Sequence, residues 1–173
     1  MSEKILKPVE KEYSAEVVAE CLVGIASRKS SLGIDEGQNP IKEGVTNLKL
    51  QKLLFFAQAA HLALFDGKPL FNDEFEAWGL GPVIPAVYRK YKGSPSDPIV
   101  VDNLNCEDGE LVRFLENIWK IFGKYSASEL VNMSHAQGTP WQMVYKSGER
   151  GIKIPKELIQ NYYKKLFKID GSG

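Results

Sequence analysis

The apolar positions are densest between residues 46 and 66, where hydrophobic residues occupy nearly the whole circumference of a helical wheel. From residue 53 to residue 65 only Gln58 and His61 are polar. A helix that is apolar on all sides is normally the buried centre of its domain. Thr46 or Asn47 provides an N-cap, and Gly67 can take the left-handed conformation that ends a helix. The pattern therefore predicts a central buried helix over residues 46–66.

Hydrophobic residues recur at three-to-four spacing in three further segments, which predicts amphipathic helices there. The first covers residues 14–30 with Ser14 as its N-cap, and the second covers residues 109–122. The last begins at Pro155, a residue that fits the first turn of a helix because its missing amide proton has no partner there. Each apolar stripe needs a partner, and the central helix can supply it.

Local signals predict two short helices before that last one. Ser126 and Glu129 form a capping box, in which each side chain accepts a hydrogen bond from the other residue's amide, and the helix they start ends before Gly138. Thr139 and Pro140 then begin a new helical turn. The chain is therefore expected to turn a corner at residues 134–141.

Strand signals are few. Residues 75–78 alternate apolar and polar positions, glycines follow at 79 and 81, and residues 97–102 form a second strand candidate, so we expect a small antiparallel hairpin. Pro82 and Pro85 precede a short helix that ends near Lys92. The fold class predicted is mainly α: a compact multi-helix domain around a buried central helix. One domain is expected over residues 1–173, with a core at 14–167, a flexible loop at 31–45 and a tail at 168–173.

The two polar residues of the central helix need partners, because a buried polar group without one costs about 1–3 kcal/mol. Asn47, Gln51 and Gln58 fall on one line of the helix, and His61 lies close to it. We expect Gln58 and His61 to hold the turn at residues 76–83 and the corner at residues 134–141 against the central helix.

Composition changes this picture little. The chain has 173 residues, 22 basic and 22 acidic, and neither a secretory signal nor a continuous membrane-spanning run. We therefore expect a cytoplasmic protein without membrane contact. Cys21 lies on an apolar helical stripe and Cys106 in an acidic loop, which predicts a core residue and a separate surface thiol.

Catalytic chemistry finds little support. The two histidines, His61 and His135, are the only neutral-pH bases, and Ser134 adjoins His135 at a spacing that points the two side chains about 100° apart on a helix. Nucleotide-binding, nucleophile-elbow and zinc-protease motifs do not occur. A metal shared by the two histidines remains an alternative, with ligands from the acids Asp66, Asp73, Glu74 and Glu76. We expect no enzyme activity, no cofactor and no metal.

Nucleic-acid binding is a second alternative. Aromatic and basic residues interleave at residues 88–92 and again at residues 162–165, as in surfaces that stack bases and contact phosphates. However, the chain has no net positive charge, so the attraction that normally accompanies such binding is missing. We therefore expect no nucleic-acid partner.

Three motifs in order resemble one known family. They are KLQKLLFFAQ at residues 49–58, EAWGLGPV at residues 76–83 and SHAQGTPW at residues 134–141. From about residue 17 to residue 167 the chain resembles the SocA-like antitoxins, or Panacea domain, found in phage-associated GepA-type proteins. The resemblance implies a mainly helical domain from bacteria or mobile elements. It also implies that the protein binds and neutralises a cognate toxin and has no enzymatic activity.

The resemblance also assigns residues. Those expected to organise the fold are Gln51, Gln58, His61, Trp78, Gly81, Pro82, His135 and Trp141. His135 is expected to anchor the corner by donating to a carbonyl, and the two tryptophans to build the core with their polar edges satisfied. Residues that nothing in the packing requires are candidates for contact with the toxin: Lys49, Lys52, Tyr88 and Arg89.

Overall fold

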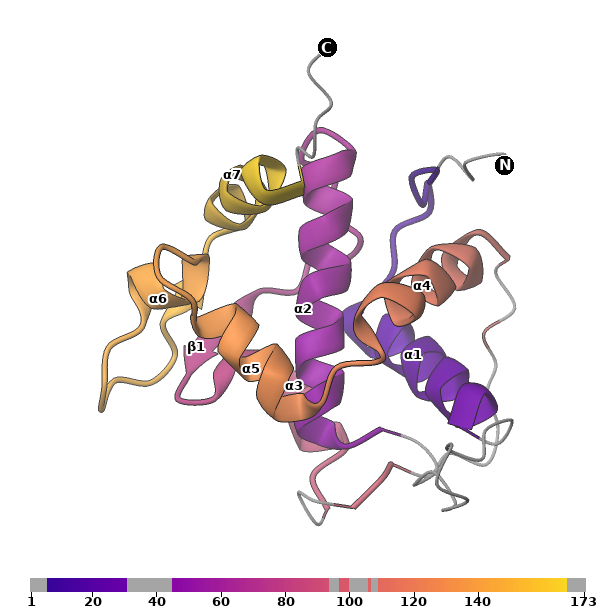
Figure 1. Ribbon diagram of the computed structural model, residues 1–173, viewed down its shortest axis with the longest axis horizontal. Coiled ribbons are helices and arrows are strands. Elements are labelled where there is room, and N and C mark those ends of the chain that lie inside the picture. The colour runs from indigo at the N-terminus through magenta and orange to yellow at the C-terminus, as the bar shows by residue number, and fades with distance from the viewer. Residues whose placement is uncertain (1–5, 31–44, 94–96, 100–105, 107–108, 168–173) are drawn as a thin grey trace.

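The computed structural model describes residues 6–30, 45–93, 97–99, 106 and 109–167, and these are arranged around one long helix (Figure 1). This helix, α2 (Asn47–Leu64), contacts α1, α4, α5, α7 and β2. The Thr46 side chain accepts from the Lys49 amide at its start. The chain leaves it through Asp66 and Gly67, both with positive φ. The predicted central helix is therefore confirmed.

The other helices pack on different sides of α2. α1 (Ala15–Ser30) and α4 (Gly109–Phe122) lie together on one side, and α7 (Lys156–Phe167) lies on the other (Figure 1). The short helices α3 (Pro85–Lys90), α5 (Ala127–His135) and α6 (Pro140–Val144) complete the helical part. The capping box of Ser126 and Glu129 is present with both hydrogen bonds. A mainly α fold is confirmed.

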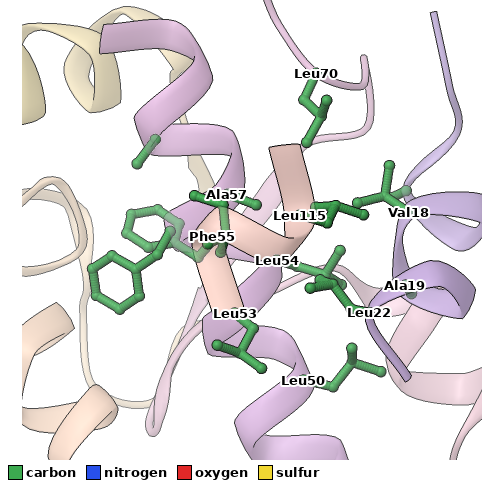
Figure 2. Close-up of a cluster of buried hydrophobic side chains, with 14 of the residues drawn as sticks. Val18, Ala19, Leu22, Leu50, Leu53, Leu54, Phe55, Ala57, Leu70 and Leu115 are labelled. Carbon is green, nitrogen blue, oxygen red and sulfur yellow. The ribbon is translucent and has the colours of Figure 1, made fainter. Parts of the chain in front are cut away.

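The core is continuous along α2, where every residue from Leu50 to Leu62 is buried. Figure 2 shows the side chain of Leu22 of α1 beside Leu54 of α2, and that of Val18 beside Leu115 of α4. On another side of α2 the Phe55 ring meets Phe75 and Tyr163 edge to face, at centroid distances of 5.2 and 5.7 Å. Each large apolar side chain buried in this way contributes about 1.5–3 kcal/mol. None of the described helices is both long and apolar enough to cross a membrane.

The strands form a small sheet in the order β2-β1-β3, and both pairings are antiparallel. β1 (Phe75–Trp78) turns through Gly79 and Leu80 into β2 (Gly81–Val83), while β3 is only Lys153–Ile154. The prediction that residues 97–102 supply the hairpin partner is wrong for residues 97–99, which are not strand; residues 100–102 lie outside the described part. β2 pairs with β1 instead, because only the two-residue turn at Gly79 and Leu80 separates these strands.

The prediction that Cys106 is a surface thiol separate from the core residue Cys21 is wrong, because the two are bonded to each other. Cys21 of α1 and Cys106, which precedes α4, form a disulfide across 85 residues of sequence, with their Cα atoms 5.3 Å apart. The packing of α1 on α4 brings them together. Disulfides are rare in the reducing cytosol, so the pairing lends no support to a cytoplasmic location, which stays a prediction.

Two predicted segments fall outside the described residues. They are the loop at 31–45, of which only the buried Val45 is described, and the tail at 168–173.

Candidate functional site

Gln58 lies fully buried near the middle of α2 and binds the segment that follows the helix. Its amide nitrogen donates to the Phe71 carbonyl over 2.6 Å, and its amide oxygen accepts from the Leu70 backbone over 2.7 Å. Both hydrogen-bonding ends of the side chain are thus used on neighbouring backbone groups. Gln58 fixes the return of the chain along α2 toward β1.

His61 is held by backbone at both ring nitrogens. The Val9 amide donates to Nε2 over 3.0 Å, and Nδ1 lies 2.6 Å from the Lys68 carbonyl. This pairing requires a neutral imidazole with its proton on Nδ1. Burial, the largest effect, lowers the pKa of His61 and favours the same neutral form. His61 therefore ties the N-terminal arm and the loop after α2 to the helix.

The expected partners of Gln58 and His61 were wrong, because both residues sit in the C-terminal half of α2, away from the hairpin. The turn at residues 76–83 is held by residues in the first two turns of α2. Gln51 accepts from the Ile84 amide over 3.0 Å and donates to Asn47 over 3.0 Å, and Asn47 donates to the Tyr88 carbonyl. This chain of bonds fixes the exit of β2 and the start of α3.

Lys52 is fully buried, which corrects the expectation that nothing in the packing requires it. Its ammonium group donates to the Pro82 carbonyl over 2.8 Å, and no carboxylate pairs with it in the described ranges. Burial lowers the pKa of Lys52 from 10.5 to about 7, since the low-dielectric interior disfavours the charged form. In this arrangement Lys52 offers no surface to a partner and instead holds β2.

Gly81 makes the close approach of Lys52 possible. Its φ is +108°, and a Cβ added there would lie 2.6 Å from Lys52 Cε and 2.8 Å from Ser134 Oγ. Any larger residue would therefore be strained at this φ and would displace the Lys52 and Ser134 side chains. Pro82 follows in β2 opposite Ala77, where its missing amide proton is tolerated on an edge strand.

The corner at residues 134–141 is closed by different atoms from those expected. The Thr139 hydroxyl donates to the Ser134 carbonyl over 2.8 Å, whereas His135 stacks on Trp141 with ring centroids 3.6 Å apart. The buried Nε2 of His135 has no hydrogen-bond partner within the described residues, so the expected donation to a carbonyl is not made from this atom. Burial and the nearby charge of Lys52 lower the pKa of His135.

The two predicted core tryptophans differ in burial. Trp141 is buried and its indole nitrogen donates to the Trp78 carbonyl over 2.7 Å, which joins the corner to β1. Trp78 is only partly buried, and its own indole nitrogen donates to Glu76. Trp78 therefore leaves part of its aromatic surface exposed on the hairpin.

Two of the groups on which the enzyme alternative depends are bonded to backbone. His61 has backbone partners at both nitrogens, and the Ser134 hydroxyl donates to the Val131 carbonyl. Across the described ranges no cluster of three metal-ligating side chains occurs.

The predicted partner-binding residues are dispersed. The half-buried Lys49 donates to the Gly123 carbonyl at the end of α4 and lies 5.2 Å from the Trp119 ring, and burial, partly offset by Glu129, lowers its pKa. Tyr88 is half-buried and its ring meets Trp78 edge to face, while Arg89 is exposed. Only Tyr88 and Arg89 therefore lie together at one part of the surface.

The basic and aromatic clusters that suggested nucleic-acid binding serve the fold in part. Lys90 pairs with Glu16 and Glu20 of α1, and the Glu20 hydrogen bond raises its pKa. Tyr163 is buried and packs on Phe55. These contacts remove two of the residues on which that alternative depended.

Two hollows flank the hairpin, and Trp78 and Gly79 line both. The first, of about 540 Å³, has mixed charges from Glu76, Glu149 and Arg150. The second, of about 310 Å³, lies between the start of α2, the hairpin and α3.

Sequence reasoning missed Leu80 in this second hollow, and it considered Tyr91 and Lys92 only as part of a nucleic-acid surface. The available signal was an apolar residue, Leu80, set between two glycines in a hairpin turn, where it cannot be buried by the strands.

Comparison with known proteins identifies the family. Residues 50–142 match the family described as antitoxin SocA-like, Panacea domain. The matched region includes nearly all of the first motif and the whole of the other two, apart from none of their residues. The chain is 35% identical over 137 residues to Antitoxin SocA of Caulobacter vibrioides (strain NA1000 / CB15N), covering 72% of each protein. No solved structure gives a significant match. On this evidence the chain belongs to the SocA-like antitoxin family that carries the Panacea domain.

Proposed function

We propose that this protein is an antitoxin that neutralises a cognate toxin by direct protein–protein contact. The observation that carries the proposal is the 35% identity to Antitoxin SocA over 72% of both chains. A match of this length extends well beyond a shared motif. It supports the same type of activity, with a toxin as partner, for this chain.

The positions of the motif residues support a binding role over a catalytic one. Gln51, Gln58 and His61 use their hydrogen-bonding groups on nearby backbone or side chains, and Lys52 does the same at β2. Polar groups occupied in this way stabilise a scaffold and are not available to bind substrate. Partner recognition is then left to the outer surface, for which a specific complex uses about 1,600 Å² in total and a few anchoring side chains.

The experiment begins with the protein encoded by the gene next to the gene for this chain. Expressed alone, it should stop growth of the host, and coexpression of this chain should restore growth and yield a complex that co-purifies. An empty vector serves as the negative control. Failure to restore growth would overturn the antitoxin role, and rescue without any complex between the purified proteins would overturn direct contact.

A further inference from the structure

The smaller hollow beside the hairpin is an aromatic groove on the surface. Three rings line it, those of Trp78, Tyr88 and Tyr91, together with the aliphatic residues Leu48 and Leu80. Leu80, at the tip of the turn, is 59% exposed, the second highest value among the large hydrophobic residues described as exposed. Tryptophan and tyrosine are the residues most enriched among binding hot spots. A volume of about 310 Å³ is at the low end for small-molecule sites and suits one or two inserted side chains.

The walls of this groove are fixed before any partner arrives. Trp78 and Tyr88 pack edge to face with centroids 5.0 Å apart. Asn47 donates to the Tyr88 carbonyl and is itself bonded to Gln51, which holds the exit of β2. A preformed wall loses little conformational entropy on binding, so more of the contact energy appears as affinity. Gln51, one of the two polar residues that organise the groove, belongs to the first family motif.

The charged residue that lines the groove is a lysine. Among the described lining residues Lys92 is basic and none is acidic, while the Glu76 carboxylate that accepts from the Trp78 indole lines the other hollow. Arg89 follows the lining residue Tyr88 on α3, and both cations are exposed. Lys90, between them, is already paired with Glu16 and Glu20. A positive rim around an apolar centre favours a partner that brings carboxylates to the rim.

We propose that this groove receives an acidic segment of the cognate toxin, which inserts a large apolar side chain against Trp78, Leu80 and Tyr88. Carboxylates of the same segment lie against Arg89 and Lys92. The proposal rests on the proposed antitoxin function and adds to it the surface and the chemistry of the partner. Lys49, which the sequence suggested as a contact, donates to the Gly123 carbonyl at the end of α4 and is not among the residues that line this groove.

The test uses the full chain with two sets of variants. Leu80→Asp places a charge at the apolar tip, and the double variant Arg89→Glu with Lys92→Glu reverses the rim. The matched control is Lys164→Glu with Lys165→Glu, which makes the same change of charge at exposed positions of α7. Circular dichroism melting first shows that each variant is folded. The dissociation constant for the purified toxin is then measured by calorimetry at two salt concentrations.

Both groove variants should bind the toxin about tenfold or more weakly, as expected for hot-spot and rim charges. The α7 control should bind as the parent does. In the parent, added salt should weaken binding, and this salt dependence should shrink in the charge-reversed variant. Replacing the responsible acid of the toxin by lysine should restore affinity to the charge-reversed variant.

The failures of the two proposals can be told apart. If the parent binds the toxin and both groove variants bind equally well, the groove assignment is wrong while the antitoxin function stands. If the parent itself does not bind, the proposed function falls first. If Leu80→Asp converts a dimer of this chain into monomers without changing toxin affinity, the groove is a self-association surface and the proposal is overturned.

Discussion

Replacing Lys52 with methionine tests the buried ammonium group that holds β2 to α2. Methionine keeps the length of the side chain and removes the charge. Burial lowers the pKa of Lys52 in the folded chain to about 7, whereas in the unfolded chain it returns to 10.5. Because the folded state binds this proton more weakly, protonation opposes folding. The destabilisation of the folded state is largest below pH 7 and disappears as the pH rises toward 10.5.

The size of the effect follows from the two pKa values. This difference in pKa destabilises the folded state by about 5 kcal/mol at low pH, and the destabilisation falls to about 2 kcal/mol by pH 9. The free energy of unfolding of the parent should therefore rise by about 2–3 kcal/mol more than that of Lys52→Met between pH 6 and pH 9. The variant also leaves the Pro82 carbonyl without its donor, but that loss of about 1–3 kcal/mol is the same at every pH.

The assay is urea unfolding followed by tryptophan fluorescence at a series of pH values and constant ionic strength. Lys120→Met, at an exposed position of α4, is the control and should change stability by less than about 0.5 kcal/mol. Equal pH dependence in the parent and in Lys52→Met would refute the reasoning. It would mean that the ammonium group reaches water and that the hairpin does not seal it as described.

Two further predictions concern the scaffold. Gln58→Leu leaves the Leu70 amide and the Phe71 carbonyl buried without partners, so the free energy of unfolding measured in urea should fall by about 2–5 kcal/mol. The control Gln137→Leu, at an exposed position, should change this free energy little. Equal stability of the two variants would show that water replaces the Gln58 side chain. Reduction of the disulfide between Cys21 and Cys106 should lower the melting temperature, because the closed loop contributes up to about 4–5 kcal/mol to stability. The number of free thiols per chain, measured by thiol titration, should rise from zero before reduction to two after it. Two free thiols in the untreated protein would contradict the pairing.

Much of the helical framework could be predicted from the sequence because its causes are local. The apolar circumference of α2, the cap at Thr46 and the capping box at Ser126 act within a few residues. The periodicity of residues 109–122 likewise located α4 to the residue. Such signals need no knowledge of the tertiary packing.

The partners of the buried polar residues could not be predicted in the same way, because packing decides them. His61 accepts from Val9, 52 residues earlier, and the two cysteines meet across 85 residues. β3 has two residues, too few to show an alternating pattern. Lys52 was predictable in principle, since a lysine inside a helix that is apolar on all sides has little route to water.

The candidate contact surface was predicted only in part. Tyr88 and Arg89 were identified among the basic and aromatic residues of α3, but their neighbours Trp78 and Leu80 come from the hairpin, and only the fold places them beside α3. A surface assembled from three elements has no signature in any one of them.

The most direct test of the account is a calorimetric titration of the purified cognate toxin with this chain, followed by native mass spectrometry of the mixture. The account predicts saturable binding, a complex of both proteins and loss of the toxin's activity as the complex forms. A toxin that stays unbound and active at micromolar concentrations, although the pair protects growing cells, would contradict neutralisation by direct contact.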